Sequence, residues 1–299
     1  MSAVAERASS WRRWRAKRVA HGLTVIEPWR PGVLPRFKEI WHHRALFRYL
    51  GREFVMKRYR KTYLGASWIL LKPGIDIFSR SLFFGGMLSV HSGDRPYFIF
   101  IAFSSAGWTI FERAWHWSTR CAKLSLSITR GLHFPRSMAV AATAVPAFID
   151  FVLYALVAIL GTVYYLVARH HWYLAAPQQM IIGVFGLVIL ILFGLALGMF
   201  TSPLAALTKE FRYVVTYTNQ FLYFVTPIVY PISALPAKYR VIAEYNPLTG
   251  PIEMVKYGFV STAPPEMKSL IVSFVGLGVV GCGGLWFSSR FERAAVARL

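Results

Sequence analysis

Long apolar runs separated by short basic segments dominate the chain. A helix that crosses a bilayer needs about 20 mainly apolar residues, and six stretches approach or exceed that length. They are residues 69–90, 96–118, 138–167, 178–203, 214–233 and 269–288. The pattern predicts an all-α integral membrane protein with six transmembrane helices.

Shorter amphipathic segments flank these spans. In residues 36–60 apolar positions recur at nearly helical spacing, with basic residues on the remaining faces. This predicts an amphipathic helix that lies in the headgroup layer of the membrane, although a solvated basic helix is an alternative. Before the last span, residues 239–245 and 252–260 are too short to cross and predict short re-entrant or interfacial helices on the extracytoplasmic side.

These features divide the chain into three parts. A basic arm with the interface helix is expected over residues 1–67, the six-span domain over residues 68–290 and a cytoplasmic tail over residues 291–299. Within the six-span domain, residues 234–267 form the external segment that contains the two short helices.

The composition places the chain in a membrane and orients it. Of 299 residues, 56% are hydrophobic and 16% are charged, against about 25% charged in soluble domains. The net charge is +21, and by this topology 25 of the 34 Lys and Arg lie on the side of both termini, with six on the other side. The positive-inside rule puts both termini in the cytoplasm of a plasma (bacterial inner) membrane. A nucleic-acid binder is equally basic but lacks apolar runs of this length, so nucleic acid is excluded as a partner.

Motifs for chemistry are missing from the sequence. It contains no G-x-x-x-x-G-K-[ST] phosphate loop, no G-x-G-x-x-G turn, no metal-type Cys/His spacing and no closely paired carboxylates. We therefore expect no catalytic, cofactor or metal site in this chain. Four histidines, at positions 42, 43, 170 and 171, keep a membrane-bound polyprenol-dependent transferase as an alternative, and a passive channel is another.

Charged side chains inside the expected spans are candidates for function. Lys72, Asp76 and Arg80 are spaced four residues apart and share one helix face. Charges at bilayer depth face protein or water, so this polar stripe is either a wall of a translocation path or a structural ladder between helices. Asp150 poses the same question, and we expect it to be a structural partner for a basic or hydroxyl group.

The fifth expected span carries an aromatic stripe. Tyr213, Tyr217, Phe221 and Phe224 follow one another at intervals of four, four and three. Aromatic rings can stack on the C–H faces of sugars, which suits a glycan pathway. Packing between helices is the commoner role of such a stripe.

Several local patterns, in their order and spacing, resemble one family. They are RYRKTYLGASWILLKP at residues 58–73, HFPR at 133–136, KEFRYV at 209–214, TPIVYPIS at 226–233 and NP at 246–247. From about residue 36 to the C-terminus, the chain is similar to the permease subunit of polysaccharide-export ABC transporters, which export O-antigen, teichoic acid, capsule and related lipid-linked glycans. This chain has Lys209 and Glu210 where the family usually has Arg-Asp, and Lys256 where it often has Arg.

The resemblance implies a homodimer with a channel between the subunits, joined to two copies of a separate ATPase that binds ATP and Mg. The cargo would be a polyprenyl-diphosphate-linked glycan, and membrane lipids would surround the interface helix. A related permease for small hydrophobic drugs is the alternative within transport.

The same resemblance assigns roles to individual residues. ATPase coupling falls to Arg130, His133, Arg136, Lys209, Glu210 and Arg212, and the extracytoplasmic gate to Tyr230, Pro231, Asn246 and Pro247. Basic residues near the interface would attract the acidic headgroup, namely Arg52, Lys57, Arg58, Arg60 and Lys61.

Overall fold

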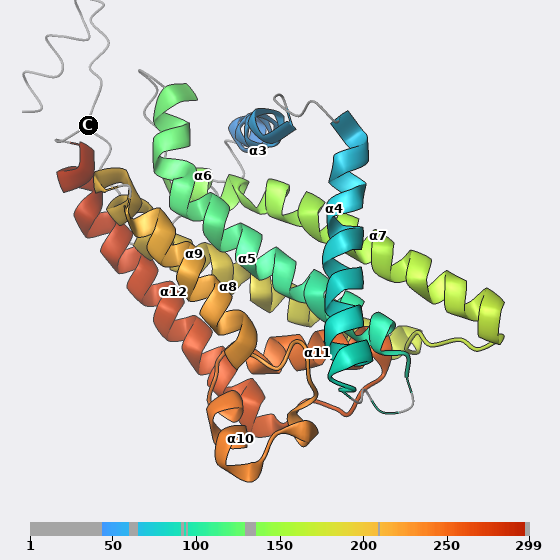
Figure 1. The fold of residues 1–299 in the computed structure, drawn as a ribbon. Coiled ribbons are helices and arrows are strands. Elements are labelled where there is room, and N and C mark those ends of the chain that lie inside the picture. Colours follow the sequence, from blue (N-terminus) through green and yellow to red (C-terminus); the bar gives the residue numbers. More distant parts are fainter. Residues whose placement is uncertain are drawn as a thin grey trace, which may run out of the picture. The chain divides into compact units, whose positions relative to one another are not determined.

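The computed structural model describes residues 44–59, 65–90, 93, 95–128, 136–208 and 210–296, and the regular structure within these ranges is helical (Figure 1). In chain order the elements are α3 (Arg44–Tyr59), α4 (Gly65–Arg80), the π-helix η1 (Ser81–Met87), α5 (Tyr97–Ile128), α6 (Arg136–Ala142), α7 (Ala144–Arg169), α8 (Pro177–Leu207), α9 (Glu210–Val225), the 3₁₀-helix η2 (Ile232–Ala234), α10 (Ala237–Glu244), α11 (Thr249–Val260) and α12 (Met267–Val296). The all-α prediction is confirmed for these residues. The basic arm before residue 44 lies outside them.

Three segments, rather than the six expected, are long and apolar enough to cross a membrane within the described ranges. They are Met138–Arg169, Pro177–Leu207 and Met267–Ser288. The other expected spans fall short for identifiable reasons. Helices α4 and α9 have 16 residues each, because the chain turns into η1 after Arg80 and leaves the helix after Val225. Helix α5 has 32 residues but carries charged side chains in its second half.

Helix α8 is the centre of the bundle and packs against α5, α11 and α12. It is apolar around its whole circumference, which is typical of a helix without a water-facing side. Gly194 and Gly198 are four residues apart and face α5: a Cβ on Gly194 would lie 2.6 Å from the Phe111 carbonyl oxygen and 2.7 Å from the Ala114 Cβ. Small residues at this spacing let two helices approach closely, as in membrane helix pairs.

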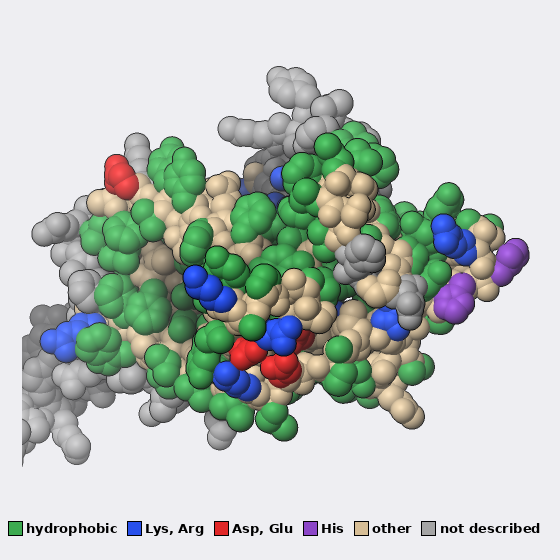
Figure 2. All heavy atoms as spheres, turned by 60° about the horizontal axis from the view of Figure 1, so that its bottom comes forward, with side chains coloured by type: hydrophobic (Ala, Val, Ile, Leu, Met, Phe, Trp, Pro, Cys, Tyr) green, Lys and Arg blue, Asp and Glu red, His purple; other side chains and the backbone are tan. Residues whose placement is uncertain are grey.

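Helix α11 is short but belongs to the core. Thr249, Ile252, Val255 and Val260 are buried, and the helix packs on α8, α5 and α12. In Figure 1 it lies across one end of the bundle, where α10 also lies. Figure 2 shows the face toward this end, on which hydrophobic side chains predominate and most of the acidic side chains in view gather beside basic ones. The two short helices before α12 are therefore present, starting two and three residues earlier than the sequence indicated.

Helix α3 lies at the opposite end of the bundle (Figure 1). Its residues Leu50 and Phe54 are fully buried in a small cluster with Cys121, Ala139 and other apolar residues of α5 and α6. Phe54 of the predicted interface helix therefore packs against protein and does not face lipid. The reason is that α5 runs on past the expected end of its span and, with α6, supplies an apolar surface that α3 covers.

Candidate functional site

The polar stripe of α4 is divided between two neighbours. Lys72 is exposed. Asp76 accepts a hydrogen bond of 2.6 Å from the Tyr154 hydroxyl of α7, whereas Arg80 donates through Nη1 to the Ser105 hydroxyl of α5 at 3.2 Å. The guanidinium of Arg80 also lies 4.6 Å from the centre of the Tyr223 ring of α9, within range of a cation–π interaction. Asp76 thus ties α4 to α7, and Arg80 points toward α5 and α9.

A second charged pair joins α5 to α7. The carboxylate of Asp150, which is buried, lies 3.4 Å from the Nε of Arg113. The expectation that Asp150 has a basic structural partner is therefore confirmed. Removal of one member of a buried pair leaves the other charge uncompensated, so this pair holds α5 and α7 in one register.

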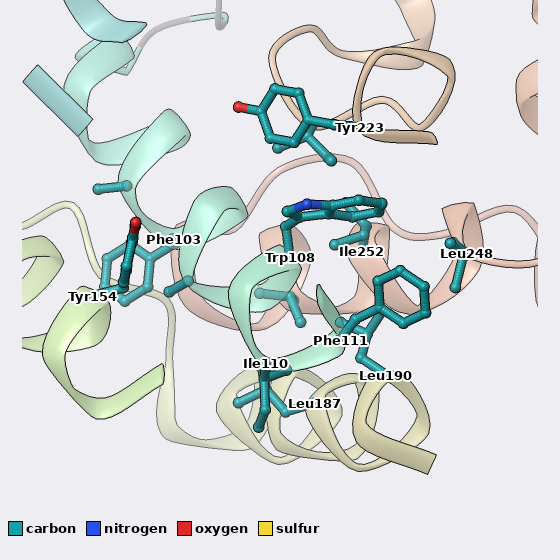
Figure 3. Packing of buried hydrophobic residues seen from close by; sticks show 14 of the residues in the cluster. Phe103, Trp108, Ile110, Phe111, Tyr154, Leu187, Leu190, Tyr223, Leu248 and Ile252 are labelled. Atoms are coloured by element: carbon teal, nitrogen blue, oxygen red, sulfur yellow. The ribbon is translucent and has the colours of Figure 1, made fainter. Parts of the chain in front are cut away.

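A polar cavity of about 350 Å³ opens beside Arg80, between α4, η1, α5 and α9. Its polar lining consists of Arg80, Glu112, His116, Thr216, Asn219 and Gln220, and its aromatic lining of Phe84, Trp108, Tyr223 and Phe224. Tyr223 stands edge-on to Trp108 with 5.7 Å between ring centres, and Figure 3 shows the two rings one above the other. The cavity combines hydrogen-bonding groups with aromatic walls, as binding sites for small polar molecules do.

The aromatic stripe of α9 lies on the outside of the helix bundle. Tyr213, Tyr217, Phe221 and Phe224 are 59–67% exposed, so their outer faces are not covered by the other described helices of the chain. Phe224 also lines the polar cavity. The opposite face of α9 carries the buried side chains of Val215, Asn219 and Tyr223. The stripe is therefore available to lipid, to a second copy or to a cargo.

The residues expected to form a gate lie in or next to hydrogen-bonded turns. Asn246 donates from Nδ2 to the Thr226 hydroxyl at 2.8 Å, and its Oδ1 accepts the backbone N–H of Leu248 at 3.0 Å. One side chain thus links the residue that follows α9 to the turn that leads into α11. Tyr230 donates to the Phe224 carbonyl at 2.7 Å. Tyr230, Pro231 and Pro247 are each half-buried.

A buried lysine donates a hydrogen bond to the same turn. Lys256 of α11 donates to the Pro227 carbonyl at 2.9 Å, and its ammonium lies 5.3 Å from the centre of the Phe100 ring. Burial lowers the pKa of Lys256 from 10.5 to about 8. Burial also raises the pKa of Glu253, one turn earlier in the helix. The position at which the family often has Arg is therefore a structural anchor here.

The structure places only part of the expected coupling and headgroup residues. Glu210 begins α9, and Arg212 of its first turn is close enough to Arg120 of α5 for the two charges to repel. Arg52 and Lys57 lie exposed on α3. Arg58 of α3 and Arg136, the first residue of α6, are placed by their backbones alone. Five of the expected residues lie outside the described part of the chain: Arg60, Lys61, Arg130, His133 and Lys209.

Sequence reasoning missed five polar residues of the cavity, namely Glu112, His116, Thr216, Asn219 and Gln220. Glu112 and His116, one turn apart on α5, have side-chain atoms 4.0 Å from each other, and their presence in an expected span was a usable signal. Asn219 and Gln220 are uncharged, so they left no mark on the charge pattern.

Comparison with known proteins finds a distant relative that aligns over most of the chain. The chain is 22% identical over 264 residues, 86% of its length, to the O-antigen export system permease protein RfbA of Myxococcus xanthus, and it covers 97% of that protein. No protein-family model matches the chain. The resemblance to polysaccharide-export permeases that the sequence motifs indicated is confirmed by this relative.

Proposed function

We propose that this chain is the membrane-spanning permease subunit of an ABC exporter that moves a polyprenyl-diphosphate-linked glycan outward across the bacterial inner membrane. The observation that carries the proposal is the alignment with an O-antigen export permease over nearly the whole length of both proteins. A separate ATPase subunit would supply the energy, and two copies of this chain would enclose the channel.

The arrangement of charge supports this assignment. Helix α3 with its exposed Arg52 and Lys57 would lie at the cytoplasmic surface, where cations attract acidic headgroups. The turn at Asn246 and Lys256 would then lie on the outer side, near the exit. Both termini would be cytoplasmic. Helix α4 continued by η1, helix α5, and helix α9 continued by the apolar turn after it would complete six spans, with their polar faces along a path or a subunit contact.

The exposed stripe of α9 favours a glycan as the cargo. Rings at Tyr217 and Phe221, each 67% exposed, present apolar faces and one hydroxyl to whatever lies outside the subunit. In a dimer with α9 at its centre they would line the channel and stack on successive sugars. Stacking of this kind is tolerant of sequence, as export of a long polymer requires.

One observation favours the alternative of a small hydrophobic cargo. A second cavity of about 640 Å³ is lined by apolar side chains of α5, α7, α8 and α11, among them Ile110, Ala155 and Phe259. If it held the cargo, the substitution Ala155→Trp would fill it and block transport. The glycan proposal predicts normal export by that variant.

Deletion and complementation in the native host test the proposal. Loss of the gene should remove a surface glycan and leave its lipid-linked form inside the cell, and the intact chain should restore export. Arg212→Glu should insert into the membrane but not restore export, because it reverses the charge at the start of α9 where coupling is proposed. The matched reversal Arg169→Glu, at the end of α7, should restore it. Unchanged surface glycan in the deletion strain would contradict the proposal, and export by Arg212→Glu would contradict the coupling role.

A further inference from the structure

The buried amide of Asn219 is the starting point, because its hydrogen-bonding capacity is unused. The residue is 3% exposed, and neither Nδ2 nor Oδ1 has a hydrogen-bond partner among the described residues. A buried donor or acceptor without a partner is energetically unfavourable. Asn219 is one of the residues that line the polar cavity, so a molecule in the cavity would lie next to this amide.

The charges around the cavity argue against an anionic ligand. Arg80 is already engaged with the Ser105 hydroxyl and the Tyr223 ring. Glu112 presents a carboxylate beside His116, and a carboxylate repels phosphate oxygens. The titratable groups that line the cavity are therefore of mixed sign and do not form the cationic cluster that a diphosphate requires.

The hydrogen-bonding pattern fits a hydroxyl-rich neutral ligand. Asn219 offers one donor group and one acceptor in the same side chain, and Gln220 beside it offers the same pair. A hydroxyl both donates and accepts, so neighbouring hydroxyls can satisfy the two ends of an amide, whereas a phosphate can only accept. Trp108 and Phe224 add aromatic surface to the wall, which suits the C–H face of a sugar ring. The volume of about 350 Å³ lies at the small end of the range for ligand sites.

We propose that the cavity beside Asn219 is a binding station for a neutral sugar unit, with the Asn219 amide as its central hydrogen-bonding group. The proposal rests on the proposed export function and adds to it a specific site inside each subunit, apart from the exposed α9 stripe. Sugars of the passing glycan would enter this site from the channel side of α9, next to Phe224.

Ligand binding is measured on the purified full chain in lipid nanodiscs by saturation-transfer difference NMR. The probes are the methyl glycosides of glucose, galactose, mannose and rhamnose, with inorganic pyrophosphate as a competitor. At least one glycoside should bind saturably, and Asn219→Leu should weaken that binding by about tenfold or more, since it removes two hydrogen bonds. Thr162→Val, which removes a buried hydroxyl of α7 away from the cavity, should bind as the wild type does. Binding of none of the four, unchanged binding by Asn219→Leu, or displacement by pyrophosphate would each overturn the proposal.

The melting temperature of the protein is the second measurement. The proposed role and a purely structural role of Asn219 predict opposite changes in it when Asn219 is replaced. Asn219→Leu should keep or raise the melting temperature, because it removes two groups without partners. Asn246→Leu is the matched comparison: that amide is also buried but has both atoms hydrogen-bonded, so its loss should lower the melting temperature. If Asn219→Leu lowers it as much as Asn246→Leu does, Asn219 is a structural residue and the station does not exist.

The two proposals fail in distinguishable ways. If the deletion strain loses its surface glycan but no glycoside binds the purified chain, export stands and the binding station is refuted. If glycosides bind at Asn219 but the deletion leaves the surface glycan unchanged, the station stands as a sugar site and the export function is refuted.

Discussion

The packing of α11 on α8 can be tested with a single methyl group. Gly186 of α8 is buried, and a Cβ built on it would lie 2.8 Å from the Met254 Cβ and 2.8 Å from the carbonyl oxygen of Pro251. Neither atom can rotate away, because one is fixed to the backbone and the other belongs to it. The substitution Gly186→Ala therefore forces α11 to move off α8. Overpacking of this kind costs about 1–3 kcal/mol.

A matched substitution separates this steric effect from helix propensity. Gly281 of α12 is also in a long helix, but a Cβ there meets nothing within 4 Å. Gly→Ala favours a helix by about 1 kcal/mol at either site, so the difference between the two variants measures the steric cost alone. Thermal unfolding in detergent, followed by tryptophan fluorescence, should show Gly186→Ala to be less stable than Gly281→Ala by this steric cost of about 1–3 kcal/mol. Equal stability of the two variants would refute the position assigned to α11.

Three further predictions follow from the charged and aromatic residues. The pKa of Lys256 is lowered from 10.5 to about 8. Between these two pH values the unfolded chain binds more protons than the folded chain, so the free energy of unfolding should rise with pH. Unfolding experiments at pH 8 and 10 should show this rise for the wild type but not for Lys256→Met, and an identical rise in both would contradict the burial of the ammonium. Arg113→Leu or Asp150→Leu alone should destabilise by about 3 kcal/mol and the double variant by much less, and additive losses in the double-variant cycle would show that the two charges do not interact. Tyr217→Ala combined with Phe221→Ala should reduce surface glycan while leaving the chain in the membrane, and unchanged surface glycan would refute the role of the stripe in the glycan path.

The hydrophobic pattern predicts the positions of the helices well and their ends less well. The sequence places α8 and α12 correctly because their apolar runs are bounded by polar residues or proline. It extended the fifth span to residue 233, whereas α9 ends at Val225 and residues 226–231 form a turn. That turn is apolar because Ile228 and Val229 are buried in the core, so composition alone could not distinguish it from helix.

Tertiary contacts decided the features that the sequence left open. The stripe of Asp76 and Arg80 was recognised, but only the fold shows that Tyr154 binds one and that Ser105 and Tyr223 contact the other. The NP and TPIVYPIS patterns were recognised separately, and the structure joins them through Asn246 and Thr226. The position of Asn219 at the cavity could not be predicted, because a single uncharged Asn in an aromatic helix changes neither the charge pattern nor the hydrophobic periodicity.

Transport in inside-out membrane vesicles tests the central claim most directly. Vesicles from cells that make this chain and its ATPase would carry radiolabelled lipid-linked glycan on their outer surface, which corresponds to the cytoplasmic leaflet. Addition of ATP should move the glycan into the lumen and make it resistant to periodate, and a non-hydrolysable ATP analogue should not. Equal protection in vesicles that lack this chain would contradict its role as the permease.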